Sequence, residues 1–187
     1  LKEIFEQPES ISNSFRGRLI RDKGLTKLGG LESVKNQLQK TEKIIISGCG
    51  TAYLAGIIGK LMIEELAGIP CEAELASELR YRPNTNYRQN LAMVAISQSG
   101  ETADTLAALR RFKERSFLTI GIVNVIGSTI ARETDAGVYN HIGPEIGVAS
   151  TKAFISQVTI LALLALFLRQ KSNLRVIKEI EKLPMMI

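Results

Sequence analysis

Short apolar segments alternate with stretches of helical length from Lys43 to the end of the chain, and this alternation limits the fold more than any other feature of the sequence. The expected strands are 43–47, 71–75, 91–96, 117–123 and 136–141, and the expected helices are 51–67, 76–81, 102–115, 128–133, 150–168 and 174–182. Repeated strand–helix units predict a parallel sheet with helices on both faces. We therefore expect an α/β fold with a doubly wound five-stranded parallel sheet, a three-layer sandwich of the flavodoxin type.

The first forty residues have a different pattern. Apolar side chains at spacings of three and four predict one helix that ends near Gly24 and another from Leu28 to Gln39. We expect residues 1–40 to form a helical segment that packs on a single domain spanning 41–187. Residues 82–86 are expected to be a loop, and nothing in the sequence indicates a second sheet, a repeat or a low-complexity region.

The charge of the chain raises the question of a polyanionic partner. The composition is that of a folded globular protein, 45% hydrophobic and 23% charged, but the net charge is +5. The basic residues are scattered, and the densest group lies at the end of an expected helix, where it opposes the helix dipole: Arg110, Arg111, Lys113 and Arg115. Without an arginine-rich tail or an aromatic RNA-binding signature, we expect no nucleic-acid partner.

Two cysteines in 187 residues do not make a disulfide framework. We therefore expect Cys49 and Cys71 to be free thiols and the protein to be cytoplasmic. The N-terminus has no apolar signal-peptide core. The most apolar stretch, Ala153 to Leu168, is short for a membrane span and suits a buried core helix, so we expect no contact with a membrane.

Three of the expected strand-to-helix loops combine small residues with hydroxyls: Ser47–Ala52, Ser97–Thr102 and Gly147–Lys152. In a parallel sheet these loops lie at one edge, and the unpaired N–H groups at a helix start attract an anion there. In the second loop the hydroxyls could surround one phosphate, with the amide or backbone of Gln98 closing the cup and Glu101 pointing away. The hydroxyls are those of Ser97, Ser99 and Thr102.

Two other interpretations of these loops stay open. Serine, threonine and glycine are also common at helix caps and turns, so each loop could simply cap its helix. Gly48-Cys49-Gly50 begins a dinucleotide-binding pattern, but Tyr53 stands where the third glycine belongs. The sequence contains no glycine-rich ATP-binding P-loop motif.

The loop sequences carry a resemblance. ISGCGTA at 46–52, SQSGETADT at 97–105 and EIGVASTKAF at 145–154 resemble the sugar isomerase (SIS) domain family. KEIFEQP at 2–8 and LAGIPCEAELASELRYR at 66–82 narrow the resemblance to the first SIS domain of isomerizing glucosamine–fructose-6-phosphate aminotransferases. The likeness covers nearly the whole chain, although SQSGET alone marks phosphosugar-binding domains broadly.

The resemblance implies substrate-binding residues on all three loops. The phosphate would be bound by Ser97, Gln98, Ser99 and Thr102; Cys49, Gly50 and Thr51 would touch the sugar and its phosphate; and Val148, Ala149 and Ser150 would lie along the sugar chain. One departure is Ala52, where the family often has serine, so one phosphate hydroxyl is missing here.

The resemblance also implies a reaction. The family makes glucosamine 6-phosphate from fructose 6-phosphate and glutamine, with a glutaminase domain, two SIS domains, a dimeric assembly and neither cofactor nor metal. The family's catalytic glutamate, ring-opening histidine and C-terminal lysine are expected beyond Ile187. We therefore expect this chain to bind a hexose 6-phosphate, fructose 6-phosphate or glucosamine 6-phosphate, without transforming it.

Several reactive residues lie outside that pattern. We expect His141, the only histidine, to be structural and Cys71 to be a small buried apolar residue. Cys49 is expected to contact substrate rather than to act as a nucleophile. Lys152 could attract phosphate or serve a helix face, and Glu145, without a partner base, receives no chemical role.

Other functions remain possible at this point. One alternative is a stand-alone phosphosugar isomerase, or a phosphosugar-sensing regulator, although no DNA-binding helix-turn-helix is evident. Another is a nucleotide-binding α/β module, which the broken glycine pattern disfavours.

Overall fold

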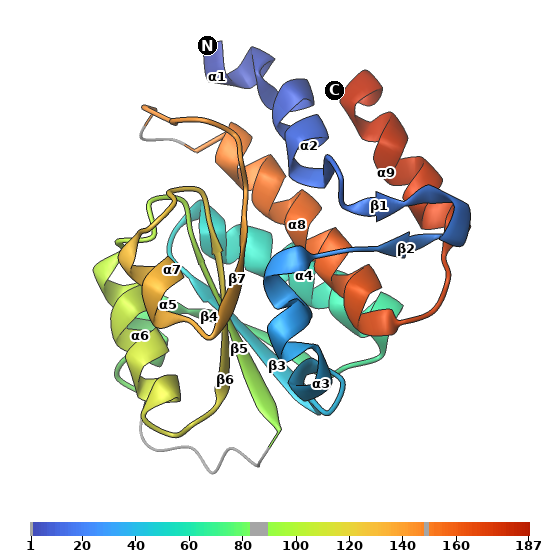
Figure 1. Ribbon diagram of the computed structural model, residues 1–187. Coiled ribbons are helices and arrows are strands. Elements are labelled where there is room, and N and C mark those ends of the chain that lie inside the picture. The colour runs from blue at the N-terminus through green and yellow to red at the C-terminus, as the bar shows by residue number, and fades with distance from the viewer. Residues whose placement is uncertain (1, 83–89, 148–149) are drawn as a thin grey trace.

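The computed structural model describes residues 2–82, 90–147 and 150–187. Its main sheet has five parallel strands in the order β4-β3-β5-β6-β7 (Figure 1). They are β3 (Lys43–Gly48), β4 (Cys71–Leu75), β5 (Leu91–Ser97), β6 (Leu118–Val123) and β7 (Ala136–Tyr139). Numbered along the sheet-forming chain, this is the 2-1-3-4-5 order of flavodoxin-like proteins, so the predicted fold class is confirmed. Most of the loop expected at 82–86 lies outside the described residues.

The three central strands, β3, β5 and β6, are almost wholly buried because helices cover both faces of the sheet. All seven residues of β5 are buried, as expected for a central parallel strand. Side chains alternate between the faces. Ile44 and Ile46 therefore join one core cluster, whereas Ile45 joins the other.

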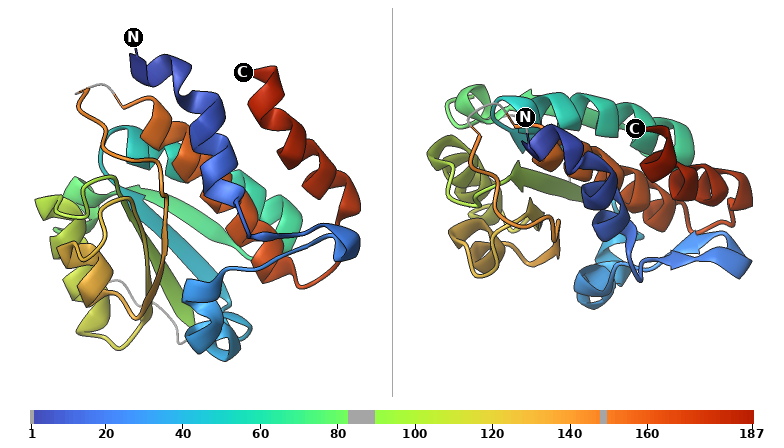
Figure 2. Two further views of the ribbon diagram at one scale, coloured as in Figure 1. Left: turned by 45° about the horizontal axis from the view of Figure 1, so that its top comes forward. Right: turned by 90° about the horizontal axis from the view of Figure 1, so that it is seen from above.

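Helices fill the outer layers on either side of the sheet (Figures 1 and 2). One core cluster contains α4 (Thr51–Ala67) and α8 (Lys152–Arg169), and the other contains α5 (Ala76–Leu79), α6 (Ala103–Lys113) and α7 (Thr129–Glu133). By length and composition alone α8 could cross a membrane. It lies instead between α4 and α2 (Gln7–Phe15), where Ile160, Leu161 and Leu163 are fully buried, as predicted for a core helix.

The N-terminal segment differs from the prediction. After α1 (Lys2–Phe5) and α2, the expected helix to Gly24 is replaced by an antiparallel pair, β1 (Leu19–Ile20) and β2 (Leu25–Thr26), joined by a 3₁₀ turn, η1 (Arg21–Lys23). The expectation of no second sheet was therefore wrong. Gly17 and Gly24 have positive φ, which stops a helix and turns the chain.

The expected helix at 28–39 is also corrected. It consists of a 3₁₀ helix, η2 (Gly29–Val34), followed by a single turn, α3 (Lys35–Leu38). Two successive glycines at its start weaken α-helix formation. The final helix, α9 (Leu174–Met186), begins at Asn173, whose side chain accepts from Val176 N at 3.2 Å, and it runs beside α2 (Figure 2).

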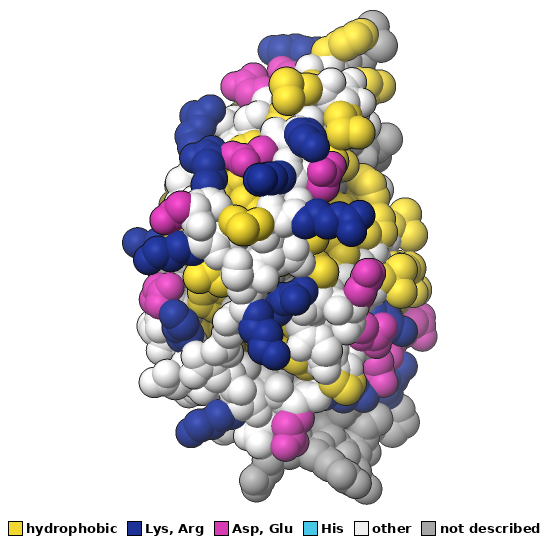
Figure 3. Space-filling view, turned by 90° about the vertical axis from the view of Figure 1, so that its right-hand side faces the viewer, with side chains coloured by type: hydrophobic (Ala, Val, Ile, Leu, Met, Phe, Trp, Pro, Cys, Tyr) yellow, Lys and Arg dark blue, Asp and Glu magenta, His cyan; other side chains and the backbone are white. Residues whose placement is uncertain are grey.

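The positive charge can be followed on one face of the molecule and at its densest basic group. On the face drawn in Figure 3, lysines and arginines are interspersed with acidic side chains. The side chains of the densest basic group also make contacts within the chain. Arg110 pairs with Glu133 at 2.7 Å, and Arg111 donates to the backbone oxygens of Leu79, Arg80 and Arg82. Arg110 thus lies on an exposed face at the end of α6, as predicted, whereas Arg111 joins α6 to the chain around Leu79–Arg82.

Gly30 lets η2 approach the edge of the sheet. A Cβ on Gly30 would overlap the carbonyl oxygen of Gly137 in β7, whereas a Cβ on Gly29 would meet nothing within 4 Å. We expect Gly30→Ala to lower the free energy of unfolding by about 1–3 kcal/mol, as overpacking does. Urea denaturation checks this, with Gly29→Ala as the matched control. Equal midpoints for the two variants would contradict the close approach.

Candidate functional site

The strand order reverses between β3 and β5, which pair directly in the middle of the sheet. From β3 the chain passes to β4 on one side, and from β5 it passes to β6 on the other. Loops that leave the carboxyl ends of two such strands diverge and open a crevice, the usual ligand site of this architecture. The first two hydroxyl-containing loops follow β3 and β5, so they flank this crevice.

The first loop brings Cys49 next to the second. The Cys49 Sγ lies 3.8 Å from the Thr105 Oγ1 in the first turn of α6. Gly50 is the N-cap of α4, with a φ of 55°, and no cap side chain bonds the first turn of that helix. Thr51 is partly exposed at the first position of the helix, and Ala52 behind it is buried. Cys49, Gly50 and Thr51 therefore lie between the end of β3 and the first turn of α4, and Cys49 contacts the start of α6.

The second loop is shaped by its own hydroxyls. The Ser97 Oγ accepts from Gly100 N at 3.0 Å and lies 2.9 Å from the Thr102 Oγ1. The Ser99 Oγ accepts from Glu101 N at 3.1 Å. These bonds hold Ser97, Ser99 and Thr102 within one turn of chain, as the phosphate-cup hypothesis requires.

The carboxylate of Glu101 turns away from the loop, as predicted. It accepts from Thr129 N at 2.7 Å at the start of α7. That backbone hydrogen bond is the main cause of a lowered pKa for Glu101, so this side chain is ionised at neutral pH. A negative charge in the mouth of the cup would repel a phosphate, and this contact keeps it elsewhere.

The start of α6 remains available to an anion. Thr102 is its N-cap, but the Thr102 side chain does not bond the first turn of the helix. Its hydroxyl is directed to Ser97 instead. Simple capping therefore does not account for the loop, and the N–H groups of this eleven-residue helix retain their partial positive charge beside three hydroxyls.

The third loop differs from the other two. The Glu145 Oε1 accepts from Thr151 N at 2.9 Å and from Ala153 N at 3.3 Å, and the Ser150 Oγ donates to the Glu145 Oε2 at 2.9 Å. A carboxylate of the chain itself thus occupies the start of α8. The expectation that all three loops are built alike for an anion was wrong here, because the N–H groups of Thr151 and Ala153 are already bonded to Glu145.

Two of the predicted site residues, Val148 and Ala149, lie outside the described residues. Ser150 is described, and its hydroxyl donates a hydrogen bond to the Glu145 carboxylate. Lys152 does not face a phosphate: it is buried and pairs with Glu6 at 2.7 Å. Of the two roles that the sequence left open for Lys152, the helix-face role is the one the structure supports.

A hollow of about 640 Å³ lies between Gln98 of the second loop and the segment 141–145 that follows β7. Its walls include Gln98, His141 and Glu145. Sequence reasoning missed Asn124, which follows β6 at the same edge and holds the loop beyond β7. Its Nδ2 donates to Gly143 O at 2.7 Å and its Oδ1 accepts from Ile142 N at 3.2 Å. Asn124 could have been found by the rule that ligands bind beyond the carboxyl ends of parallel strands, which singled out the loops after β3 and β5.

His141 is exposed. It has a φ of 58° and lies just beyond β7, 6.0 Å from the ring of Tyr139. Partial burial and, secondarily, the charge of Arg18 lower the pKa of His141, so its imidazole is neutral at neutral pH. Its place in the wall of the hollow makes it the residue to test for chemistry.

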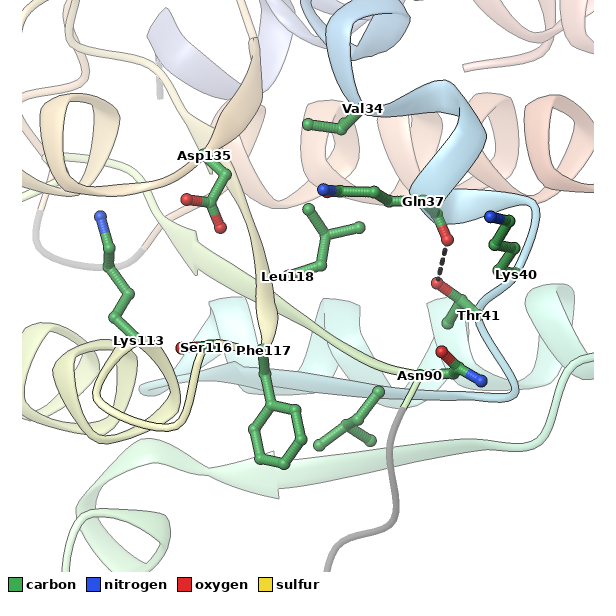
Figure 4. Close-up of a pocket in the computed structure, with 11 residues that line it drawn as sticks. Val34, Gln37, Lys40, Thr41, Asn90, Lys113, Ser116, Phe117, Leu118 and Asp135 are labelled. Atoms are coloured by element: carbon green, nitrogen blue, oxygen red, sulfur yellow. Dashed lines mark hydrogen bonds between the residues drawn. The ribbon is translucent and has the colours of Figure 1, made fainter.

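Another hollow, of about 570 Å³, opens at the opposite edge of the sheet (Figure 4). Lys40 and Lys113 lie on opposite sides of it, and Asp135 forms part of the wall. The Asp135 carboxylate is already engaged, since it accepts from Thr119 N and Oγ1 at 2.8 and 2.7 Å. This hollow is remote from the hydroxyl loops, so it is not the site that they predict.

In the described part of the chain, no cluster of three His, Cys, Asp or Glu side chains could hold a metal ion. Cys71 is buried, as predicted, and burial raises the pKa of its thiol to about 12. Both cysteines are free.

Comparison with known proteins agrees with the geometry. The SIS domain family model matches residues 37–167. A relative from Chlorobaculum tepidum, named glutamine–fructose-6-phosphate aminotransferase [isomerizing], is 49% identical over 96% of this chain. The chain spans 31% of that relative's length.

Solved structures extend the likeness. The C-terminal domain of glucosamine-fructose-6-phosphate aminotransferase from Francisella tularensis superposes with a TM-score of 0.89 at 38% identity, covering 98% of this chain and 53% of that one. A glucosamine-6-phosphate deaminase from Thermotoga maritima shares the fold, with a TM-score of 0.76 at 23% identity over 98% of this chain and 53% of its own. With most of its length matched by the family model, this chain belongs to the SIS domain family.

Proposed function

We propose that this chain binds a hexose 6-phosphate, with the phosphate in the loop Ser97–Thr102 at the start of α6. The observation that carries the proposal is the hydroxyl cluster of this loop beside a helix N-terminus that no cap side chain occupies. A phosphate dianion would accept from the hydroxyls of Ser97, Ser99 and Thr102 and from backbone N–H groups. Gln98 adds an amide at the edge of the hollow.

The sugar would extend from this cup along the crevice. Cys49, Gly50 and Thr51 flank one side, and the contact between Cys49 and Thr105 supports their closeness to the cup. Ser150, with Val148 and Ala149, is proposed for the other side. Because Ala52 offers no hydroxyl, the phosphate would depend more heavily on the second loop than in relatives with serine at this position.

We further propose that the chain is the first SIS domain of an isomerizing glutamine–fructose-6-phosphate aminotransferase. The name of the Chlorobaculum relative, and the 31% of its length that this chain spans, support this assignment. A glutaminase domain and a second SIS domain would then complete the protein, which would work as a cytoplasmic homodimer. In this arrangement residues 1–40 are an N-terminal segment packed on the SIS domain 41–187.

Within the described residues, the groups next to the cup suit binding better than proton transfer. An aldose–ketose isomerisation needs a positioned base, typically worth about 10²–10⁴ in rate. Glu145 is engaged by the start of α8, and no hydrogen bond or ion pair joins His141 to a carboxylate in the described part of the chain. We therefore expect binding of fructose 6-phosphate without interconversion.

Calorimetry and NMR test this expectation on the 187-residue chain. Fructose 6-phosphate and glucosamine 6-phosphate should each release heat on titration, while NMR should detect no conversion above the uncatalysed rate. Fructose without phosphate is the matched control and should not bind. Turnover that disappears in His141→Ala or Glu145→Gln would contradict the binding-only proposal and favour a complete phosphosugar isomerase.

A further inference from the structure

Two carboxylates of the N-terminal helices reach across to the third loop. The Glu3 Oε1 accepts from Ile146 N at 2.7 Å and from Gly147 N at 3.1 Å. Glu6, one turn later, accepts from the Lys152 Nζ at 2.7 Å. The residues joined are more than 140 positions apart in the sequence, so tertiary structure alone brings them together.

The contact between Glu6 and Lys152 is built into the packing. The Lys152 side chain is 6% exposed and that of Glu6 28%, so the ammonium has little access to water. Lys152 is also the first residue of α8. A buried charge is strongly destabilising without a partner of opposite charge. The start of α8 must therefore lie where Lys152 can reach Glu6.

The contact belongs to a polar seam between α2 and α8. One turn farther along α8, the Ser156 Oγ lies 2.6 Å from the Ser14 Oγ and accepts from the Asn140 Nδ2 at 2.7 Å. Buried polar pairs, unlike apolar ones, are satisfied in one register only. The seam therefore sets where α8 begins and, with it, where the third loop ends.

We propose that Glu6, assisted by Glu3, is a positioning residue for the sugar side of the site. The proposal rests on the proposed function, because the third loop is taken to face the sugar. Glu3 holds the backbone where the loop starts, at Ile146 and Gly147. Glu6 holds Lys152, where α8 starts, and Glu145, just before the loop, accepts from Thr151 near the end of the loop. Affinity for a sugar phosphate thus depends on the first two helices, while affinity for phosphate alone does not.

The test compares two probes on the whole chain, inorganic phosphate and fructose 6-phosphate, by calorimetry. Glu6→Gln should raise the Kd for fructose 6-phosphate about tenfold, which is about 1.4 kcal/mol. It should leave the Kd for phosphate unchanged. Glu9→Gln is the matched control, since among the described residues no ion pair involves Glu9, and it should bind both probes normally.

Hydrogen exchange gives an independent readout. In the Glu6→Gln variant, the amides of Thr151 and Ala153 should exchange faster than in the wild type. In the milder variant Glu3→Gln, the amides of Ile146 and Gly147 should exchange faster. Equal weakening of both probes, or normal sugar-phosphate binding despite faster exchange, would overturn the proposal. A wild-type chain that binds no fructose 6-phosphate would refute the proposed function, and unchanged exchange in both variants would refute the positioning.

Discussion

Cys71 is expected to react with a thiol reagent more than about a thousandfold more slowly in the folded protein than after unfolding. The thiolate is the reactive form. Burial, and next the charge of Glu64, raise the pKa of Cys71 to about 12, so at pH 8 about one thiol in ten thousand is ionised. An unfolded cysteine, with a pKa of about 8.5, is about one-quarter ionised at that pH. Only 3% of the residue is exposed, which slows the reagent further.

A labelling time course with Ellman's reagent measures this difference. The folded chain should show one accessible thiol, Cys49, which is partly exposed, and a second only after denaturant is added. Cys49→Ser is the control and should leave only the slow thiol. Saturating fructose 6-phosphate should slow the labelling of Cys49 if that residue touches substrate. Two fast thiols in the folded protein would contradict the burial of β4, and no thiols at all would reveal a disulfide.

The centre of the main sheet could be predicted from the sequence because β3, β5 and β6 are buried on both faces. A segment such as Leu91–Ser97, with all seven residues buried, is a continuous apolar run between turn residues, a pattern that few other structures produce. The helices between the strands were predictable to within a few residues for the same reason. Thr51–Ala67 begins after Gly50 and ends before Gly68, which adopts the left-handed conformation.

The N-terminal hairpin was not predictable by the same method. Leu19–Ile20 and Leu25–Thr26 are two-residue strands, too short to show the alternation that marks a strand. Apolar residues at 11, 15 and 19 also fit a helix equally well. Lys27 N donates to Arg18 O at 2.8 Å between the two arms of the hairpin. The tertiary contact that favours the hairpin is made by Thr26, which donates to Leu163 O in α8 at 3.0 Å.

The parts of the candidate site that depend on local sequence could be predicted. Hydroxyls and glycine after a strand indicated the loop Ser97–Thr102, and electrostatics required that Glu101 turn away. The difference at the third loop could not be foreseen. A capping glutamate is expected at the third helical position, whereas Glu145 lies six residues before Thr151 and reaches it through the path of the loop. The pair Glu6–Lys152 joins helices whose packing the sequence does not encode locally.

The largest expected effect on function comes from the hydroxyls of the second loop. Ser99→Ala or Thr102→Val should each weaken fructose 6-phosphate binding about ten- to a hundredfold. A hydrogen bond to a charged group contributes about 1.5–3 kcal/mol, and each 1.4 kcal/mol is a factor of ten in Kd. Thr102→Val also removes the partner of the Ser97 Oγ, which lies 2.9 Å away, so it should have the greater effect of the two.

Binding must be separated from folding in this experiment. Because the Thr102 side chain does not cap α6, its loss should change the free energy of unfolding by less than the roughly 1 kcal/mol of a lost cap. Thr41→Val is the matched control: that hydroxyl donates to Gln37 O at 3.2 Å at the opposite edge of the sheet (Figure 4). It should bind normally in calorimetry. Normal binding by Ser99→Ala and Thr102→Val as well would mean that the loop shapes its own backbone and holds no phosphate. Weak binding by Thr41→Val would mean that the affinity reports stability and not contact.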